Sequence, residues 1–269
     1  MDNKFLIDDV TINPGYSSAN GDTQNPFYGA YGYTISGGPL QNRDLIVATQ
    51  NAASKLNSTS DARRARLFTL VSGNVVGIKQ GENAAAAPDV VSSIGAAIIP
   101  MPVSGNASVG SAMAGYVMTL SEVKFLLAEA ALKYPIFGSL YDPKTTFEAG
   151  ISASFLRLNV GTTAALSTTA ANNYLAAINL TPGFGWDGTT NKVEAIMTQK
   201  WIALMHVSGH ESWIDYVRTG FPITLNALVN VNGKPMRLMY PQSEISANSA
   251  NVPSQTAATV FASGPFWKL

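Results

Sequence analysis

Two histidines and an adjacent carboxylate, His206, His210 and Glu211, form one group of residues whose types and spacing could do chemistry. Histidines four residues apart on a helix can bind one metal ion. Gly209 lies between them, however, and glycine commonly ends a helix. There is also no glutamate between the two histidines to act as a general base. We therefore predict two partly exposed histidines at a helix junction, with no metal site and no cofactor.

A glycine-rich segment, Gly183-Phe184-Gly185-Trp186-Asp187-Gly188, matches the dinucleotide-binding fingerprint by letter. The fingerprint needs a preceding strand and small residues where the phosphate approaches. Here Pro182 precedes the segment and Trp186 obstructs it, so we interpret it as an aromatic-bearing turn. No Gly-x-Ser-x-Gly elbow is present, which argues against a serine hydrolase. Glu122 and Glu129, seven residues apart, are interpreted as helix-stabilising or interhelical partners.

Aromatic residues in loops are the remaining lead. Sugars present flat C–H faces that stack on Tyr and Trp, and amide or carboxylate side chains reach their hydroxyls. The competing interpretation is that each ring fills the core of its own loop, because large aromatic side chains are highly buried on average. The candidate ligand-binding residues are Tyr16, Tyr28, Tyr31, Tyr33, Trp186 and Asp187.

Composition excludes several classes of function. The chain has 269 residues, with 17 Lys plus Arg and 17 Asp plus Glu, so its net charge is zero. A neutral chain lacks the basic surface that binds nucleic acid. The absence of cysteine rules out disulfides and thiolate chemistry. The sequence shows no signal peptide and no apolar run long enough to span a membrane, so as it stands we expect a soluble chain.

Residues 1–115 are expected to form a loop-rich lobe. Turn signals follow one another closely, and only a short helix is indicated, from Arg43 to Lys55. Alternating apolar residues on both sides of Ser72-Gly73-Asn74 predict a β-hairpin over 67–79. The charged segment Asp61-Ala62-Arg63-Arg64 is expected to be solvated.

Residues 116–269 are expected to form a helical lobe, so that 1–269 is one domain. Thr119 and Glu122 have the spacing of a capping box, and Thr145 and Glu148 repeat it. Two paired antiparallel helices follow within 116–158, with small residues at their contact. This arrangement is typical of tetratricopeptide-type units, although no 34-residue repeat is present. A short helix is expected over 168–180.

The last two predicted helices organise the lobe. The first begins at Asn191, carries Trp201 and ends at Gly209, and the second carries Trp213 and ends at Gly220 and Pro222. The two tryptophans can together bury more apolar surface than any other pair of side chains in the chain. The resulting fold class is mainly α, with tetratricopeptide-like helical pairs, long irregular loops and a minor β-hairpin.

The sequence resembles the SusD/RagB-like family of outer-membrane nutrient-binding lipoproteins from gut and oral bacteria of the Bacteroides type. The resemblance is strongest in the signature Gln199–Pro222, with Glu211, Trp213, Asp215 and Arg218-Thr219-Gly220. The other matching segments are Glu122–Ala131, Gly150–Phe155 and, near the end, Arg237 with Tyr240-Pro241, Glu244 and Asn248. These segments cover about 116–267.

The resemblance implies a non-catalytic protein that binds an oligosaccharide or polysaccharide and delivers it to a TonB-dependent, SusC-like transporter. It implies a position at the outer membrane, facing outward and held by a lipid anchor. The chain departs from the family pattern, because the N-terminal helical-repeat region and the lipidated cysteine are missing. We therefore expect it to correspond to the C-terminal portion of such a protein. A helical-repeat module that binds a peptide or a partner protein is the alternative.

Overall fold

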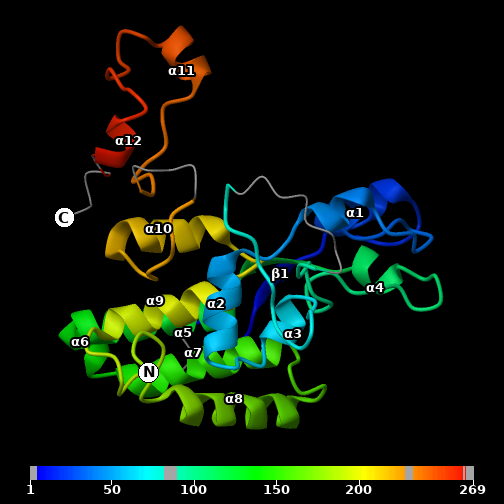
Figure 1. Ribbon diagram of the computed structural model, residues 1–269, viewed down its shortest axis with the longest axis horizontal. Helices are drawn as coiled ribbons and strands as arrows, with labels where there is room; N and C mark the ends of the chain where they lie inside the picture. The colour runs from blue at the N-terminus through cyan, green and yellow to red at the C-terminus, as the bar shows by residue number, and fades with distance from the viewer. Residues whose placement is uncertain (1–4, 82–89, 228–232, 263, 265–269) are drawn as a thin grey trace.

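The chain is described by a computed structural model that covers residues 5–81, 90–227, 233–262 and 264. Helices dominate these residues, and the first half of the chain is mostly irregular (Figure 1). The elements of that half are β1 (Val10–Ile12), η1 (Gly21–Thr23), α1 (Pro26–Tyr31), η2 (Gln41–Leu45), α2 (Gln50–Ser58), α3 (Arg64–Leu67), α4 (Ser108–Ser111) and β2 (Gly115–Met118). The second half contains α5 (Leu120–Lys133), α6 (Pro135–Gly138), α7 (Pro143–Arg157), α8 (Ala164–Ile178), α9 (Lys192–Ala203), α10 (Gly209–Thr219), α11 (Gln242–Ala247) and α12 (Thr259–Ala262).

The helices of the second half begin at capping residues. The side chains of Thr119, Asp142, Thr163 and Asn191 each accept a hydrogen bond from a backbone N–H in the first turn of α5, α7, α8 and α9. Such a cap contributes roughly 1 kcal/mol, because it pairs an N–H group that the helix leaves free. The caps at Thr119 and Asn191 agree with the sequence prediction. For α7 the predicted Thr145–Glu148 box is wrong, since Asp142 is the cap and Thr145 supplies the N–H.

Close approach of α5 and α7 depends on a glycine. A Cβ on Gly150 of α7 would lie 2.9 Å from the Phe125 ring of α5. The small residue therefore lets the two helices pack directly, as the sequence predicted. Around this contact lies one buried cluster, to which α5, α7, α8 and α9 contribute Phe125, Phe147, Ile151, Phe155, Tyr174, Ile178, Ile196 and Met197. The mainly helical, tetratricopeptide-like fold class is thus confirmed.

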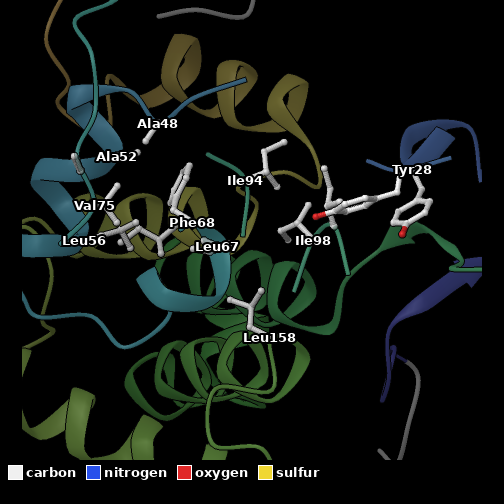
Figure 2. Close-up of a cluster of buried hydrophobic side chains, with 14 of the residues drawn as sticks. Tyr28, Ala48, Ala52, Leu56, Leu67, Phe68, Val75, Ile94, Ile98 and Leu158 are labelled. Carbon is white, nitrogen blue, oxygen red and sulfur yellow. The ribbon is translucent and has the colours of Figure 1, made fainter. Parts of the chain in front are cut away.

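A second buried cluster joins the irregular half to the helices (Figure 2). Tyr28, Leu56, Leu67 and Phe68 of the irregular half belong to it, as does Leu158 at the end of α7. Ile202 of α9 is part of the same cluster. Because both halves supply residues to this cluster, the irregular half packs its buried side chains against the helices.

The charged segment after α2 is not solvated, which corrects the sequence expectation. Asp61 and Arg63 are fully buried and form an ion pair of 2.6 Å. Arg63 also donates to Gln199 Oε1 at 2.8 Å, and its guanidinium lies near both the Phe155 ring and the Tyr174 ring, 4.9 Å and 5.1 Å from their centroids. Burial disfavours the charge, but Asp61 keeps the pKa of Arg63 above its ordinary value. This cluster ties the irregular half to α7, α8 and α9.

The predicted hairpin over 67–79 is also corrected. Val71 and Asn74 do form the expected tight turn, but the flanking residues pair elsewhere. Phe68 bridges Ile94, and Ile78 bridges Thr49. The two-stranded antiparallel sheet of the described residues is instead β1 with β2, in which Thr11 is opposite Tyr116. Segments that are distant in sequence thus compete successfully with the local hairpin.

The boundary between α9 and α10 differs from the prediction as well. Helix α9 ends at Ala203, and Gly209 is the first residue of α10 and not the end of α9. His206 in the connection has a φ of 61°, in the left-handed region that few residues other than glycine adopt. Gly220 does end α10 as predicted, with a φ of 80°.

The last part of the chain stands away from the body. Figure 1 shows α11 and α12 beyond α10, apart from the stacked helices α5, α7, α8 and α9. No helix among the described residues is both long and apolar enough to cross a membrane.

Candidate binding cleft

The predicted tyrosines of the first loop lie mostly in the interior. Tyr28 is fully buried, its hydroxyl donates to the Pro100 carbonyl at 3.1 Å, and its ring fills the space beside Gly110. Tyr33 is also buried. A buried ring has no free face for a sugar, so the structure favours the competing interpretation that these two rings fill the core, and ligand binding by them stays a prediction. Tyr16 and Tyr31 are half-buried, and Tyr31 packs against the second buried cluster.

The second predicted group, Trp186 and Asp187, lies in the loop between α8 and α9. Trp186 is half-buried and packs against Phe147, with ring centroids 5.3 Å apart. Asp187 is exposed and accepts hydrogen bonds from Lys144 at 2.7 Å and Asn179 at 3.0 Å. Both residues therefore have structural partners, and ligand binding by them remains a prediction.

The glycines around Trp186 serve chain packing. A Cβ on Gly185 would lie 1.9 Å from the Ile178 carbonyl oxygen at the end of α8. The glycine is thus needed where the turn meets α8, and this close approach agrees with the interpretation of the segment as a turn.

A cleft of about 330 Å³ opens where α9 ends, beside α10 and the start of α2. Figure 1 shows α10 above α9 with α2 next to them. Trp201 of α9 and Trp213 and Tyr216 of α10 supply aromatic rings to the cleft. Trp213 and Tyr216 are three residues apart, so they share one face of α10. Polar groups come from Thr49, Asn51, Gln80, Ser212 and Thr224.

The two tryptophans differ in their packing. Trp201 is half-buried and packs against the second cluster, as a core residue should. Trp213 is half-buried as well, but it belongs to neither of the two buried clusters. The sequence prediction assigned both rings to a common scaffold. The structure instead leaves Trp213 facing the cleft, available to a ligand.

His206 forms part of the same cleft. Its ring contacts the ring of Phe68 edge-on, with centroids 5.0 Å apart, and its Nε2 atom has no hydrogen-bond partner among the described residues. Burial, with a smaller contribution from Arg157, lowers the pKa of His206 to about 4. The imidazole is therefore neutral at physiological pH.

Lys234 is the one lysine or arginine among the described residues that line the cleft. The Nζ atom of Lys234 lies 4.5 Å from the centroid of the Tyr216 ring and donates to the Thr224 carbonyl at 2.7 Å. Burial lowers the pKa of Lys234 below its ordinary value.

The six residues that the sequence predicted as ligand-binding, five aromatic residues and Asp187, do not line this cleft. The sequence signal for the site was the spacing of Trp213 and Tyr216 on one amphipathic helix, which also fits a core face.

A second group of charges lies on the other side of α10. Lys200, which is almost fully buried, forms an ion pair of 2.8 Å with Asp215, and Arg218 pairs with both Glu129 and Asp215. Burial raises the pKa of Glu122 in the same cluster, although Lys200 opposes this shift. The acidic groups are matched by basic ones, so the cluster connects α5, α9 and α10. This agrees with the interhelical role predicted for Glu129.

The described residues contain no group of three or more metal-ligating side chains. His206 and His210 do not share a helix, because His206 precedes α10 and His210 lies in its first turn. The described residues of the cleft offer a ligand the faces of aromatic rings, side-chain amides and the ammonium of Lys234.

Comparison with known proteins gives a consistent family match. The family model for SusD-like proteins, described as SusD and RagB outer membrane lipoprotein, matches residues 42–261. A search of curated proteins gave no significant match.

Solved structures show the same fold. A SusD homologue from Bacteroides thetaiotaomicron is 27% identical, with a TM-score of 0.56 over 75% of this chain and 45% of its own. A SusD homologue from Bacteroides uniformis is 24% identical, with a TM-score of 0.65 over 97% of this chain and 56% of its own. A chitin-binding protein is 20% identical, with a TM-score of 0.59 over 82% of this chain and 49% of its own. This chain spans about half the length of these relatives.

Proposed function

Because this chain belongs to the SusD-like family of outer-membrane lipoproteins, we propose that it is a non-catalytic, glycan-binding part of an outer-membrane nutrient-uptake system. In this proposal the protein captures an oligosaccharide at the outward face of the outer membrane. It then delivers the sugar to a TonB-dependent, SusC-like transporter. Family membership and the chitin-binding relative support the proposal.

The observation that carries the proposal for this chain is the aromatic cleft beside α10. Trp213 and Tyr216 present ring surface next to the polar side chains of Asn51, Gln80 and Thr224. A pyranose has the matching chemistry, with C–H faces that pack on a ring and hydroxyls that pair with amides. Among the described residues that line the cleft there is no pair of carboxylates, and Ser212 donates to the Ser208 carbonyl and not to His206, so these groups favour binding over catalysis.

The direct test is isothermal titration of the purified chain with a panel of neutral and acidic oligosaccharides of defined length. We expect saturable binding of at least one class with micromolar to millimolar affinity. Absence of binding to every polysaccharide class would contradict the proposal.

A second candidate function rests on exposed apolar side chains of α5 and α6. Leu126, Leu132 and Ile136 are more than a third exposed, and Ile214 of α10 adds to them. Leu126 and Ile214 line the same hollow. Such a surface suits contact with a protein partner. Recovery of a defined protein partner by pull-down, together with no sugar binding, would favour a protein-interaction module.

A further inference from the structure

The charges around the aromatic cleft are unbalanced. Lys234 is the charged side chain among the described residues that line it, and no carboxylate lines it with Lys234. No ion pair of Lys234 is present among the described residues. Among the residues that the structure describes, its ammonium has the Tyr216 ring and the Thr224 carbonyl as partners. An ammonium can donate three hydrogen bonds, so part of its capacity remains for a ligand.

A second lysine strengthens the positive character of this region. Lys55 of α2 lies with its Nζ atom 5.5 Å from the Phe184 ring centroid. Burial lowers the pKa of Lys55, Glu194 opposes the shift, and the charge of Lys234 adds to it. The charge of Lys234 therefore disfavours the charge of Lys55, a lysine outside the cleft lining, and Glu194 offsets this repulsion at Lys55. An anion placed in the cleft would relieve this repulsion.

We propose that the cleft selects acidic oligosaccharides, with a uronic-acid carboxylate paired to Lys234 while a neighbouring pyranose ring packs on Trp213. This inference rests on the proposed glycan-binding function and names its ligand class. A neutral sugar would leave the Lys234 charge uncompensated in a partly buried site, whereas a carboxylate forms a charge-assisted hydrogen bond there. The aromatic rings and the cation together distinguish a uronic acid from a simple anion.

The experiment compares pairs of ligands that differ only in charge. Hexagalacturonate and hexamannuronate are titrated into the chain beside their fully methyl-esterified forms, at low and at high salt. We expect each acid that binds to do so at least tenfold more tightly than its ester at low salt, with the difference shrinking as salt rises. Equal or tighter binding of the esters would overturn the inference.

Variants then assign the effect to Lys234. Lys234→Gln should weaken binding of the acid about tenfold and change binding of a neutral ligand less than twofold, whereas Lys234→Arg should keep most of the acid preference. The matched control is Lys192→Gln, because Lys192 lies over the Trp186 ring and donates to backbone carbonyls in the same way but does not line the cleft. Unchanged acid binding by Lys234→Gln would overturn the inference.

Two further arms separate the possible failures. Binding of neutral oligosaccharides without any uronate overturns the acidic selectivity and leaves the glycan-binding function in place. Silence of all sugars contradicts both. A hexaglutamate peptide that binds as tightly as the uronates would show that the site takes acidic peptides, and it would overturn the saccharide class.

Discussion

His206 combines a left-handed backbone conformation, an edge-on contact with Phe68 and an imidazole nitrogen without a partner in the described chain. The three features occur together in the wall of the cleft. The pKa of His206 is about 4 in the folded protein and has its ordinary value of 6.5 in the unfolded chain. Between these two pH values the imidazole is therefore mostly neutral in the folded protein and mostly protonated in the unfolded chain.

This difference predicts an acid sensitivity. Above pH 6.5 both states hold a neutral imidazole, so His206 adds no pH dependence to the free energy of unfolding. As pH falls from 6.5 towards 4, protonation favours the unfolded chain and stability is lost. His206→Asn, which tolerates the left-handed backbone and does not titrate, should lose less stability between pH 7 and pH 4.5 than the wild type.

Urea unfolding of both proteins at several pH values measures this difference, and the comparison cancels the carboxylates that titrate in both. The expected gap between the variant and the wild type grows steadily below pH 6.5. Parallel pH profiles for the two proteins would show that His206 is not buried as a neutral group.

The buried pair of Asp61 and Arg63 shows why single residues were hard to place from the sequence. Charged residues are almost never fully buried unless they are paired, so a solvated segment was the reasonable expectation. Asp61 is a near neighbour in the sequence, but other groups that surround the pair are not: Gln199, which accepts a hydrogen bond from Arg63, lies 136 residues later in the chain. No local pattern reports such a contact. The burial of Tyr28 is hidden from the sequence for the same reason, since residues that cover it come from 98–110.

At the scale of elements, some local signals are confirmed, whereas the Thr145–Glu148 box, the stop at Gly209 and the long-range strand pairing are wrong. The caps at Thr119 and Asn191 and the stop at Gly220 depend on neighbouring residues, and the structure confirms them. The hairpin over 67–79 failed because its residues pair with segments near 49 and 94. Alternating apolar residues indicate an extended chain but do not identify its partner.

The contact between α5 and α7 predicts the effect of one methyl group. Gly150→Ala would place a Cβ 2.9 Å from the Phe125 ring, so the helices must separate or the ring must move. Overpacking of this kind costs about 1–3 kcal/mol, against a gain of about 1 kcal/mol in helix propensity. We expect net destabilisation in urea or thermal unfolding.

Gly209→Ala is the matched control. A Cβ on Gly209 at the start of α10 meets nothing within 4 Å, so only the propensity term applies. This variant should be as stable as the wild type or slightly more stable. A Gly150→Ala variant that gained as much stability as Gly209→Ala would show that α5 and α7 are not in close contact.

At the scale of the whole molecule, the two halves are joined by a shared core and by the Arg63 cluster. The mainly helical class and the family were both predictable, because the signature Gln199–Pro222 contains packing and capping residues that a fold needs. The binding site was not predictable in the same way. Trp213 has the spacing of a core residue, and only the course of the chain around it shows that the ring faces a cleft.

This placement makes α10 a helix with two roles. One face carries Asp215 and Arg218, which pair with α5 and α9. The other carries Trp213 and Tyr216, which line the cleft. The ion pairs thus hold the helix in place while its aromatic face remains free for a ligand.

The most direct test of this account is the affinity of the Trp213→Ala variant for the tightest-binding oligosaccharide, measured by isothermal titration beside Trp186→Ala. Removal of a ring that stacks on a sugar should weaken binding at least tenfold, or about 1.4 kcal/mol, while Trp186→Ala should change it little. If Trp213→Ala bound the sugar like the wild type, the cleft beside α10 would not be the binding site. If Trp186→Ala instead lost binding, the site would lie in the loop after α8.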